Sequence, residues 1–230
     1  MDGKMNWNPW HGCYRISEGC KNCYVFDRDE SFGRKTACIT KTSGFDLPIR
    51  KSRLGSYKVS DGCKIYTCMT SDFFIDFADQ WRPEAWEMIH MRNQVSFIIF
   101  TKRVERINEC LPKNWNEGYP NVTLICSVEN QKQCDYRLPI FKNIPSQHKM
   151  IACAPLLERI VLEPYLDHSI ELVSVCGENG KSARVCDYDW VLSLREQCER
   201  KMTSFRYIKT GTYLKKDNRK YFIPFAKQEE

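Results

Sequence analysis

Short apolar runs alternate with amphipathic segments along most of the chain, beginning after a polar stretch that ends near residue 61. The apolar runs have the length of buried strands, and the segments between them repeat apolar residues at helical spacing. Predicted strands lie at 5–10, 64–70, 95–100, 122–128, 149–153, 171–176 and 205–209. Predicted helices lie at 79–92, 104–110, 131–141 and 188–201. This alternation predicts an α/β fold in which helices cover a parallel sheet.

Seven such strands suffice for a complete or partial (β/α) barrel of parallel strands, and a doubly wound open sheet is the alternative. At 230 residues the chain favours one domain, 1–230. The polar stretch 27–61 is predicted to be an irregular insertion that folds over the loop before it, with weak strand content at 47–49 and 57–59. Residues 212–230 are predicted to be a C-terminal extension, with a basic turn at 215–220 and an extended piece at 221–225.

Composition narrows the class of protein. Hydrophobic residues make up 42% of the chain and charged residues 28%, which excludes disordered and fibrous proteins. No apolar run approaches the roughly 20 residues that cross a bilayer, and the N-terminal residues lack the apolar block of a signal peptide. Thirteen cysteines without a secretion signal favour a reducing compartment, so we expect a cytoplasmic protein without membrane association. The net charge of +6 permits an acidic partner such as nucleic acid.

The first candidate functional site is the cysteine loop (residues 10–24), which carries Cys13, Cys20 and Cys23 in the spacing C-x6-C-x2-C. Thiolates are preferred ligands of both zinc and iron–sulfur clusters. With His11 as a fourth ligand, the three cysteines would form a structural zinc site. A [4Fe–4S] cluster held by only three cysteines instead keeps one iron open for a substrate or cofactor. The loop alone is compatible with either interpretation.

Four of the remaining cysteines lie near the predicted carboxyl ends of strands: Cys68, Cys126, Cys153 and Cys176. A second metal cluster built from them is one interpretation. Single cysteines on parallel strands are more often small buried apolar residues, and we expect these four to lie in the core.

Polar clusters follow five of the predicted strands. They are Ser71-Asp72, Lys102-Arg103, Glu129-Asn130, Gly177-Glu178-Asn179-Gly180 and Lys209-Thr210-Gly211. Each cluster by itself is also explained by helix capping, a solvated ion pair or turn geometry. Because the carboxyl ends of parallel strands meet at one edge, the five together predict a single site around the cysteine loop.

Several motifs resemble those of a family of phage and mobile-element proteins known by its three-cysteine motif. They are Trp7-Asn8-Pro9, the three cysteines, Ser71-Asp72-Phe73-Phe74, Thr101-Lys102-Arg103, Ser127-Val128-Glu129-Asn130-Gln131, Pro155-Leu156-Leu157 and 177–184, followed by a helix from Trp190 to Cys198. That family has no agreed activity and is regarded as a distant relative of the radical S-adenosylmethionine enzymes. Where the family usually has a glutamate before Pro155, this chain has Ala154.

The resemblance implies a radical-enzyme-like barrel and a [4Fe–4S] cluster on Cys13, Cys20 and Cys23. It also implies an S-adenosylmethionine cofactor near Glu178, an electron-donor protein and radical chemistry on an unknown substrate. The basic segments 50–53 and 215–220 suggest that this substrate is derived from nucleic acid. The candidate catalytic residues are Asp72, Lys102, Glu129 and Lys209. The candidate cofactor-binding residues are Ser71, Asn130, Gly177, Glu178 and Asn179.

The alternative function is a non-catalytic nucleic-acid-binding protein with a structural zinc or cluster loop. In that case the aromatic residues Trp7, Trp10, Tyr14 and Tyr24 would stack on bases. Packing around the metal would explain the same four side chains.

Overall fold

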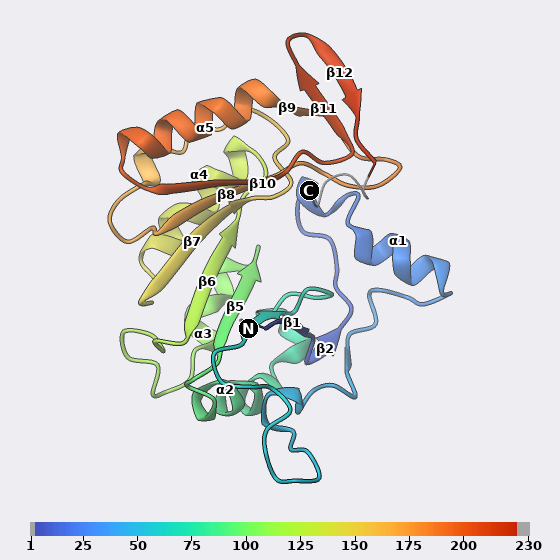
Figure 1. Cartoon of the computed structure of the whole chain (residues 1–230), viewed down its shortest axis with the longest axis vertical. Coiled ribbons are helices and arrows are strands. Elements are labelled where there is room, and N and C mark those ends of the chain that lie inside the picture. The colour runs from blue at the N-terminus through green and yellow to red at the C-terminus, as the bar shows by residue number, and fades with distance from the viewer. Residues whose placement is uncertain (1–2, 225–230) are drawn as a thin grey trace.

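The computed structural model describes residues 3–224, which form an α/β fold around one seven-stranded parallel sheet (Figure 1). In spatial order its strands are β1 (Lys4–Trp7), β4 (Lys64–Thr67), β5 (Ser96–Thr101), β6 (Val122–Ser127), β7 (His148–Cys153), β8 (Leu172–Cys176) and β10 (Ser204–Lys209). Every neighbouring pair is parallel, and the sheet curls into a half-barrel. The predicted α/β class, the seven strands and the partial barrel are confirmed.

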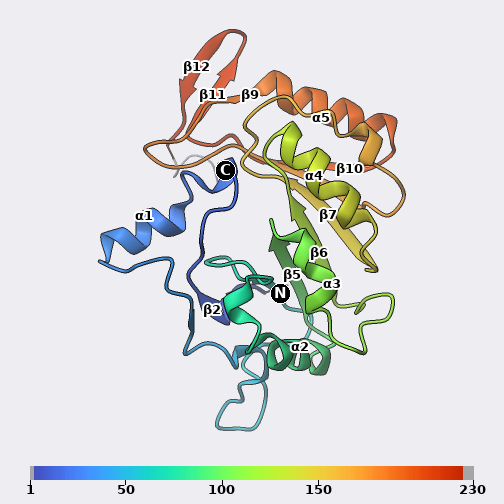
Figure 2. The same cartoon turned by 180° about the vertical axis from the view of Figure 1, so that it is seen from behind.

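Helices cover the outer face of this sheet, where α3 and α4 lie in front of the strands in Figure 2. The helices that follow the strands are α2 (Arg82–Met91), α3 (Ile107–Cys110), α4 (Gln131–Lys142) and α5 (Tyr188–Arg200). The predicted helix at 104–110 is divided into the 3₁₀ turn η4 (Val104–Arg106) and α3. Two further 3₁₀ turns are η3 (Asp76–Ala78) and η5 (Glu163–Tyr165). In α5 the apolar stripe Val191, Leu194 and Cys198 is buried, as the helical spacing predicts.

The N-terminal third of the chain has short elements, and its segment 27–61 contains little regular structure. Its elements are β2 (Trp10–His11), η1 (Glu18–Cys20), α1 (Tyr24–Ser31), β3 (Thr40–Lys41) and η2 (Leu47–Ile49). The prediction of strand content at Leu47–Ile49 is wrong, because Pro48 lacks the N–H that a strand ladder needs. At 57–59 the only strand-like contact is an isolated bridge from Tyr57 to Lys51.

Two parts of the 27–61 segment pack in different places. The backbone N–H of Cys13 donates to the carbonyl oxygen of Thr36 at 2.8 Å, so residues near 36 border the cysteine loop. Farther along, the guanidinium of Arg92 at the end of α2 donates to the carbonyl oxygens of Pro48 and Val59. The later residues therefore pack beside α2.

A second, three-stranded sheet contains β9 (Cys186–Asp187), β11 (Tyr213–Lys216) and β12 (Arg219–Phe222). Strands β11 and β12 form an antiparallel hairpin whose turn residues, Asp217 and Asn218, have φ values of +51° and +57°. The basic segment 215–220 is thus a turn flanked by strand residues. Phe225, at the end of the predicted extended piece, lies outside the described residues.

Aromatic side chains connect the cysteine loop to the core. Trp10 packs on Phe73 with ring centroids 5.2 Å apart, and Phe73 packs on Trp86 at 4.8 Å. Trp7 and Trp10 are fully buried, and their indole N–H groups donate to the carbonyl oxygens of Phe45 and Asp72. The expectation that these two tryptophans stack on bases is therefore wrong, because no face of either ring is accessible.

All thirteen cysteines are free thiols. Of the four proposed as a second cluster, Cys68, Cys126 and Cys153 are fully enclosed in the core. Burial raises the pKa of Cys126 to about 12, so its thiol is protonated at neutral pH. These three cysteines are core residues, as expected, whereas Cys176 is only partly buried.

None of the helices in residues 3–224 is long and apolar enough to cross a membrane.

We predict that Gly177→Ala strongly destabilises the protein. A Cβ at Gly177 would lie 1.9 Å from the carbonyl oxygen of Thr210, where the ends of β8 and β10 meet. Overpacking of this kind should lower the free energy of unfolding by about 3 kcal/mol, measured by urea denaturation. Gly44→Ala is the matched control, because the nearest atom to its Cβ would be 3.7 Å away. Equal stabilities of the two variants would contradict this close approach.

Candidate functional site

The cysteine loop runs along the carboxyl ends of the parallel strands, from β2 to the start of α1 (Figure 1). Gly12 opens it with φ +102°, and a Cβ there would lie 2.7 Å from the carbonyl oxygens of Thr36 and Cys38. The backbone N–H of Gly12 donates to the carbonyl oxygen of Thr70 at 3.2 Å, and the hydroxyl of Ser71 donates to the carbonyl oxygen of Gly12 at 2.5 Å. Ser71, a candidate cofactor-binding residue, thus holds the loop just before its first cysteine.

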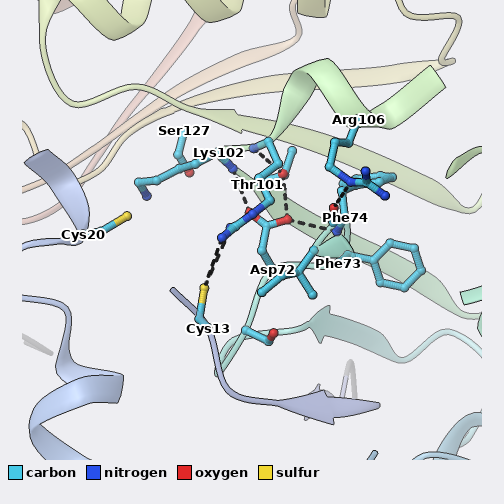
Figure 3. Close-up of polar contacts among 12 residues, drawn as sticks. Cys13, Cys20, Asp72, Phe73, Phe74, Thr101, Lys102, Arg106 and Ser127 are labelled. Atoms are coloured by element: carbon cyan, nitrogen blue, oxygen red, sulfur yellow. Dashed lines mark hydrogen bonds and ion pairs between the residues drawn. The ribbon is translucent and has the colours of Figure 1, made fainter. Parts of the chain in front are cut away.

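Asp72 connects the end of β4 to the residues after β5. One carboxylate oxygen accepts from the Thr101 hydroxyl at 2.8 Å and the Phe74 N–H at 3.0 Å, and the other accepts from the Lys102 N–H at 3.0 Å. The second oxygen also pairs with the guanidinium of Arg103 at 3.2 Å. Figure 3 shows Asp72 at the centre of these contacts, beside Cys13. With both oxygens engaged, Asp72 acts in this geometry as a positioning residue.

Arg103 carries this network to the first cysteine. Both of its terminal nitrogens lie 3.8 Å from the sulfur of Cys13, and one donates to the carbonyl oxygen of Tyr14 at 3.0 Å. Its guanidinium also lies over the ring of Tyr14, 4.4 Å from the centroid. Since the Arg103 side chain is buried, Cys13 faces a fixed positive charge.

Glu129, at the end of β6, holds the loop next to its second cysteine. Its side chain is fully buried, and it accepts from the backbone N–H of Gly19 at 3.1 Å. The other carboxylate oxygen accepts from Arg137 on α4 at 2.7 Å. Burial alone would raise the pKa of Glu129, but Arg137 and hydrogen bonds from Ser17 and Gly19 bring it below its usual value. A side chain at position 19 would collide with this carboxyl group, since its Cβ would lie 2.9 Å from Glu129 Cδ.

Glu178, after β8, holds the loop next to its third cysteine. It accepts from the side-chain amide of Asn22 at 3.1 Å and from the backbone and guanidinium of Arg184 at 2.8 Å. Burial would raise the pKa of Glu178, but Arg184 and Asn22 lower it overall. In the same turn, the side-chain oxygen of Asn179 is buried and has no hydrogen-bond partner among the described residues. Asn179 therefore has an unused acceptor in the turn whose Glu178 contacts the loop.

The remaining candidates have different surroundings. The ammonium of Lys102 lies 3.4 Å from the carbonyl oxygen of Ala154. Burial raises the pKa of Cys23, and the charge of Lys102 opposes part of that rise. Burial likewise raises the pKa of Cys176, and Lys209 opposes that shift. The carbonyl oxygen of Lys209 accepts from Gly177 N–H at 2.9 Å. Asn130 is the N-cap of α4, where its side chain accepts from Gln133 N–H at 2.9 Å.

The three loop thiols interact electrostatically. Burial raises the pKa of Cys13 to about 11, with Arg103 opposing and Cys20 adding to the shift. Burial also raises the pKa of Cys23, and Cys20 again contributes. In Figure 3 the sulfurs of Cys13 and Cys20 point toward the same space. Nearby, His11 Nε2 contacts both carboxylate oxygens of Asp29 at 2.9 Å.

The donor set fits a cluster ligated by three cysteines. Within residues 3–224 no three His, Cys, Asp or Glu side chains converge as ligands of a single metal ion. In a [4Fe–4S] cluster each cysteine binds a different iron, so the three cysteine sulfurs need not converge on a single point. Three free, partly buried thiols beside Arg103 and Lys102 are chemically suited to a cluster that needs thiolate ligands and nearby positive charge.

Sequence reasoning missed the arginines that complete these contacts. Arg103, Arg137 and Arg184 each pair with one of the three carboxylates at the strand ends. Arg103 and Arg184 both lie in the motifs named above, but the sequence predicts a role only for their neighbours Lys102 and Glu178. A signal was available for Arg137 and Arg184, because each buried acid at a strand end requires a cation.

We predict that Glu129→Gln loosens the cysteine loop and destabilises the fold. The substitution keeps the shape but leaves Arg137 without its buried partner, which should lower the free energy of unfolding by about 3 kcal/mol. Urea denaturation measures this loss, and hydrogen exchange at Gly19 measures the loosening. Glu163→Gln is the matched control, because Glu163 pairs with Arg200 at the surface and its loss should leave the midpoint nearly unchanged. Equal effects of the two substitutions would refute the anchoring role.

A protein-family model described as "Protein of unknown function (DUF5131)" matches residues 3–228. Comparisons with curated proteins and with solved structures find no match. Since the family match covers nearly the whole chain, the protein belongs to the DUF5131 family.

Proposed function

We propose that this chain is an iron–sulfur protein that binds a [4Fe–4S] cluster through Cys13, Cys20 and Cys23 and acts as a radical S-adenosylmethionine enzyme. The observation that carries the proposal is the placement of three free cysteines on one loop at the carboxyl ends of seven parallel strands. The half-barrel is, in this proposal, a radical-enzyme-like barrel.

The number of ligands supports the proposal. The loop offers three thiols. A fourth cysteine, the exposed Cys38, lies outside the loop on a segment whose backbone contacts Gly12. A cube held by the three loop cysteines alone retains one iron for the amino and carboxylate groups of S-adenosylmethionine. Asn179, with its unused acceptor, lies in the turn whose Glu178 contacts the loop, and we propose this turn as part of the cofactor site.

The chain's own residues would position the group and adjust its charge. Arg103 directs two N–H donors toward Cys13, and Lys102 adds a positive charge near Cys23, so both favour the thiolate forms that a cluster requires. Glu129 accepts from the backbone of Gly19 and Glu178 accepts from the side chain of Asn22, so both fix the loop between the cysteines. When bound, the cluster would supply the electron that cleaves S-adenosylmethionine to a 5′-deoxyadenosyl radical, and an electron-donor protein would restore that electron.

We predict that the protein, reconstituted without oxygen, binds about four iron and four sulfide ions per chain. Its reduced form should give a paramagnetic resonance spectrum that changes when S-adenosylmethionine is added. Cys13→Ala, Cys20→Ala or Cys23→Ala should abolish the cluster, whereas Cys38→Ala should retain it, because Cys38 is an exposed cysteine outside the trio. Stoichiometric zinc without sulfide would overturn the proposal and favour a structural metal loop. A cluster whose spectrum does not change when S-adenosylmethionine is added would overturn the radical function but not the iron–sulfur assignment.

A second prediction concerns the electronics of the cluster. Arg103→Lys should lower its reduction potential, because a single ammonium cannot contact both Asp72 and Cys13, and hydrogen bonds to cluster sulfurs raise the potential. The expected shift is on the order of 50 mV, which for a one-electron couple is about a tenfold change in the equilibrium constant for reduction. Arg106→Lys is the control, because Arg106 contacts Asp79 and Phe74 but none of the three cysteines. Identical potentials in the wild type and Arg103→Lys would refute this role.

A further inference from the structure

The hairpin of β11 and β12 is a basic projection. Lys216, Arg219 and Lys220 are all exposed, and in residues 3–224 none of the three has a carboxylate within 4.0 Å. The ammonium of Lys220 lies 4.5 Å from the centre of the Tyr213 ring. All four residues of β12 are exposed, so the hairpin extends away from the body of the protein, as Figure 1 shows at its top.

Exposed aromatic rings accompany these cations. Phe222 is 66% exposed and Tyr221 is 42% exposed, and Phe222 packs on Tyr213 with ring centroids 5.7 Å apart. A hairpin that served only solubility would gain nothing from these rings, because exposed aromatic surface is unfavourable in water. Cations interleaved with exposed rings are the combination that binds phosphates and stacks bases.

The hairpin is attached directly to the strand ends that hold the cysteine loop. Gly180 N–H donates to the hydroxyl of Thr212 at 3.1 Å, and Thr212 N–H donates to the carbonyl oxygen of Glu178 at 2.8 Å. The side chain of the same Glu178 accepts from Asn22 of the loop. Thr212 is the residue before β11 begins, so the base of the hairpin is joined through Glu178 to the cysteine loop.

The chain's other basic segment has a different location. Lys51, Arg53 and Lys58 are also exposed, but they belong to the loop at the opposite end of the molecule in Figure 1. That loop packs beside α2, where Arg92 contacts Val59. Of these two basic segments, therefore, the hairpin is the one that combines exposed cations with proximity to the cysteine loop.

We propose that the β11–β12 hairpin binds nucleic acid with unpaired bases and presents it to the cysteine loop. Lys216, Arg219 and Lys220 contact the phosphates, and Phe222 provides a surface on which a base stacks. This inference rests on the proposed function, for which it names the substrate class as a polynucleotide. The type of turn suits the task, since two consecutive residues with positive φ form a tight, well-defined hairpin.

The test is fluorescence anisotropy with a labelled single-stranded oligonucleotide and a duplex of the same length, between about 50 mM and 200 mM salt. The full-length chain is used, its iron and sulfide content is measured in each preparation, and thermal melting confirms that each variant is folded. The triple variant Lys216→Gln, Arg219→Gln, Lys220→Gln should bind the single strand at least about tenfold more weakly. With the single strand, the slope of log K against log salt should become shallower by roughly 2, about 0.7 for each cation removed.

The control variant Lys51→Gln, Arg53→Gln, Lys58→Gln makes the same change in net charge and should bind like the wild type. Phe222→Ala should weaken binding of the single strand while leaving the salt dependence unchanged, because stacking does not involve phosphates. Equal losses in the two triple variants would show a general charge effect and overturn the proposal. A duplex bound as tightly as the single strand, with no effect of Phe222→Ala, would refute base stacking.

The two proposals fail in different ways. If the protein holds a cluster but binding does not depend on the hairpin, this inference is wrong and the iron–sulfur function stands. If no cluster forms but binding is lost with the hairpin cations, the radical function is wrong and the hairpin remains a nucleic-acid surface.

Discussion

Buried charges at the ends of the strands must be paired, and this requirement shapes the cysteine loop. An unpaired buried carboxylate costs several kcal/mol, roughly 3–5 when an existing partner is removed. Asp72, Glu129 and Glu178 are all buried, and each is paired with an arginine and with one or more N–H donors. These pairs link the sheet to a loop that has little regular structure of its own.

The contacts follow the order of the strands. Ser71 after β4 holds Gly12, Arg103 after β5 contacts Cys13, Glu129 after β6 holds Gly19, and Glu178 after β8 holds Asn22. The loop therefore crosses the sheet in the same direction as the strand order, with a fixed point beside each cysteine. Such repeated fixing limits the loop to one arrangement, which a ligand held by three separate thiols requires.

This arrangement also bears on the chemistry. Carboxylates whose oxygens are already bonded to arginines and backbone N–H groups are poor general bases, because protonating them would break those contacts. The site offers instead three thiols, the cations Arg103 and Lys102, and an unused acceptor on Asn179. A bound cofactor would then supply the reactivity, with the protein providing position and charge, which agrees with the proposed function.

The local pattern of the sequence determined the strands, the helices that follow them, and the strand ends at which polar residues gather. Those features depend on periodicity within a few residues, so the spacing of apolar positions was enough. The three cysteines were recognisable for the same reason, since their spacing is local. Only the tertiary structure decided that the sheet is a half-barrel, that Trp10 is buried, and that the strand-end carboxylates hold the loop. Gly19 and Glu129 are 110 residues apart, and Asn22 and Glu178 are 156 apart. Pairing over such distances depends on where the folded strands place each side chain, which no local spacing encodes.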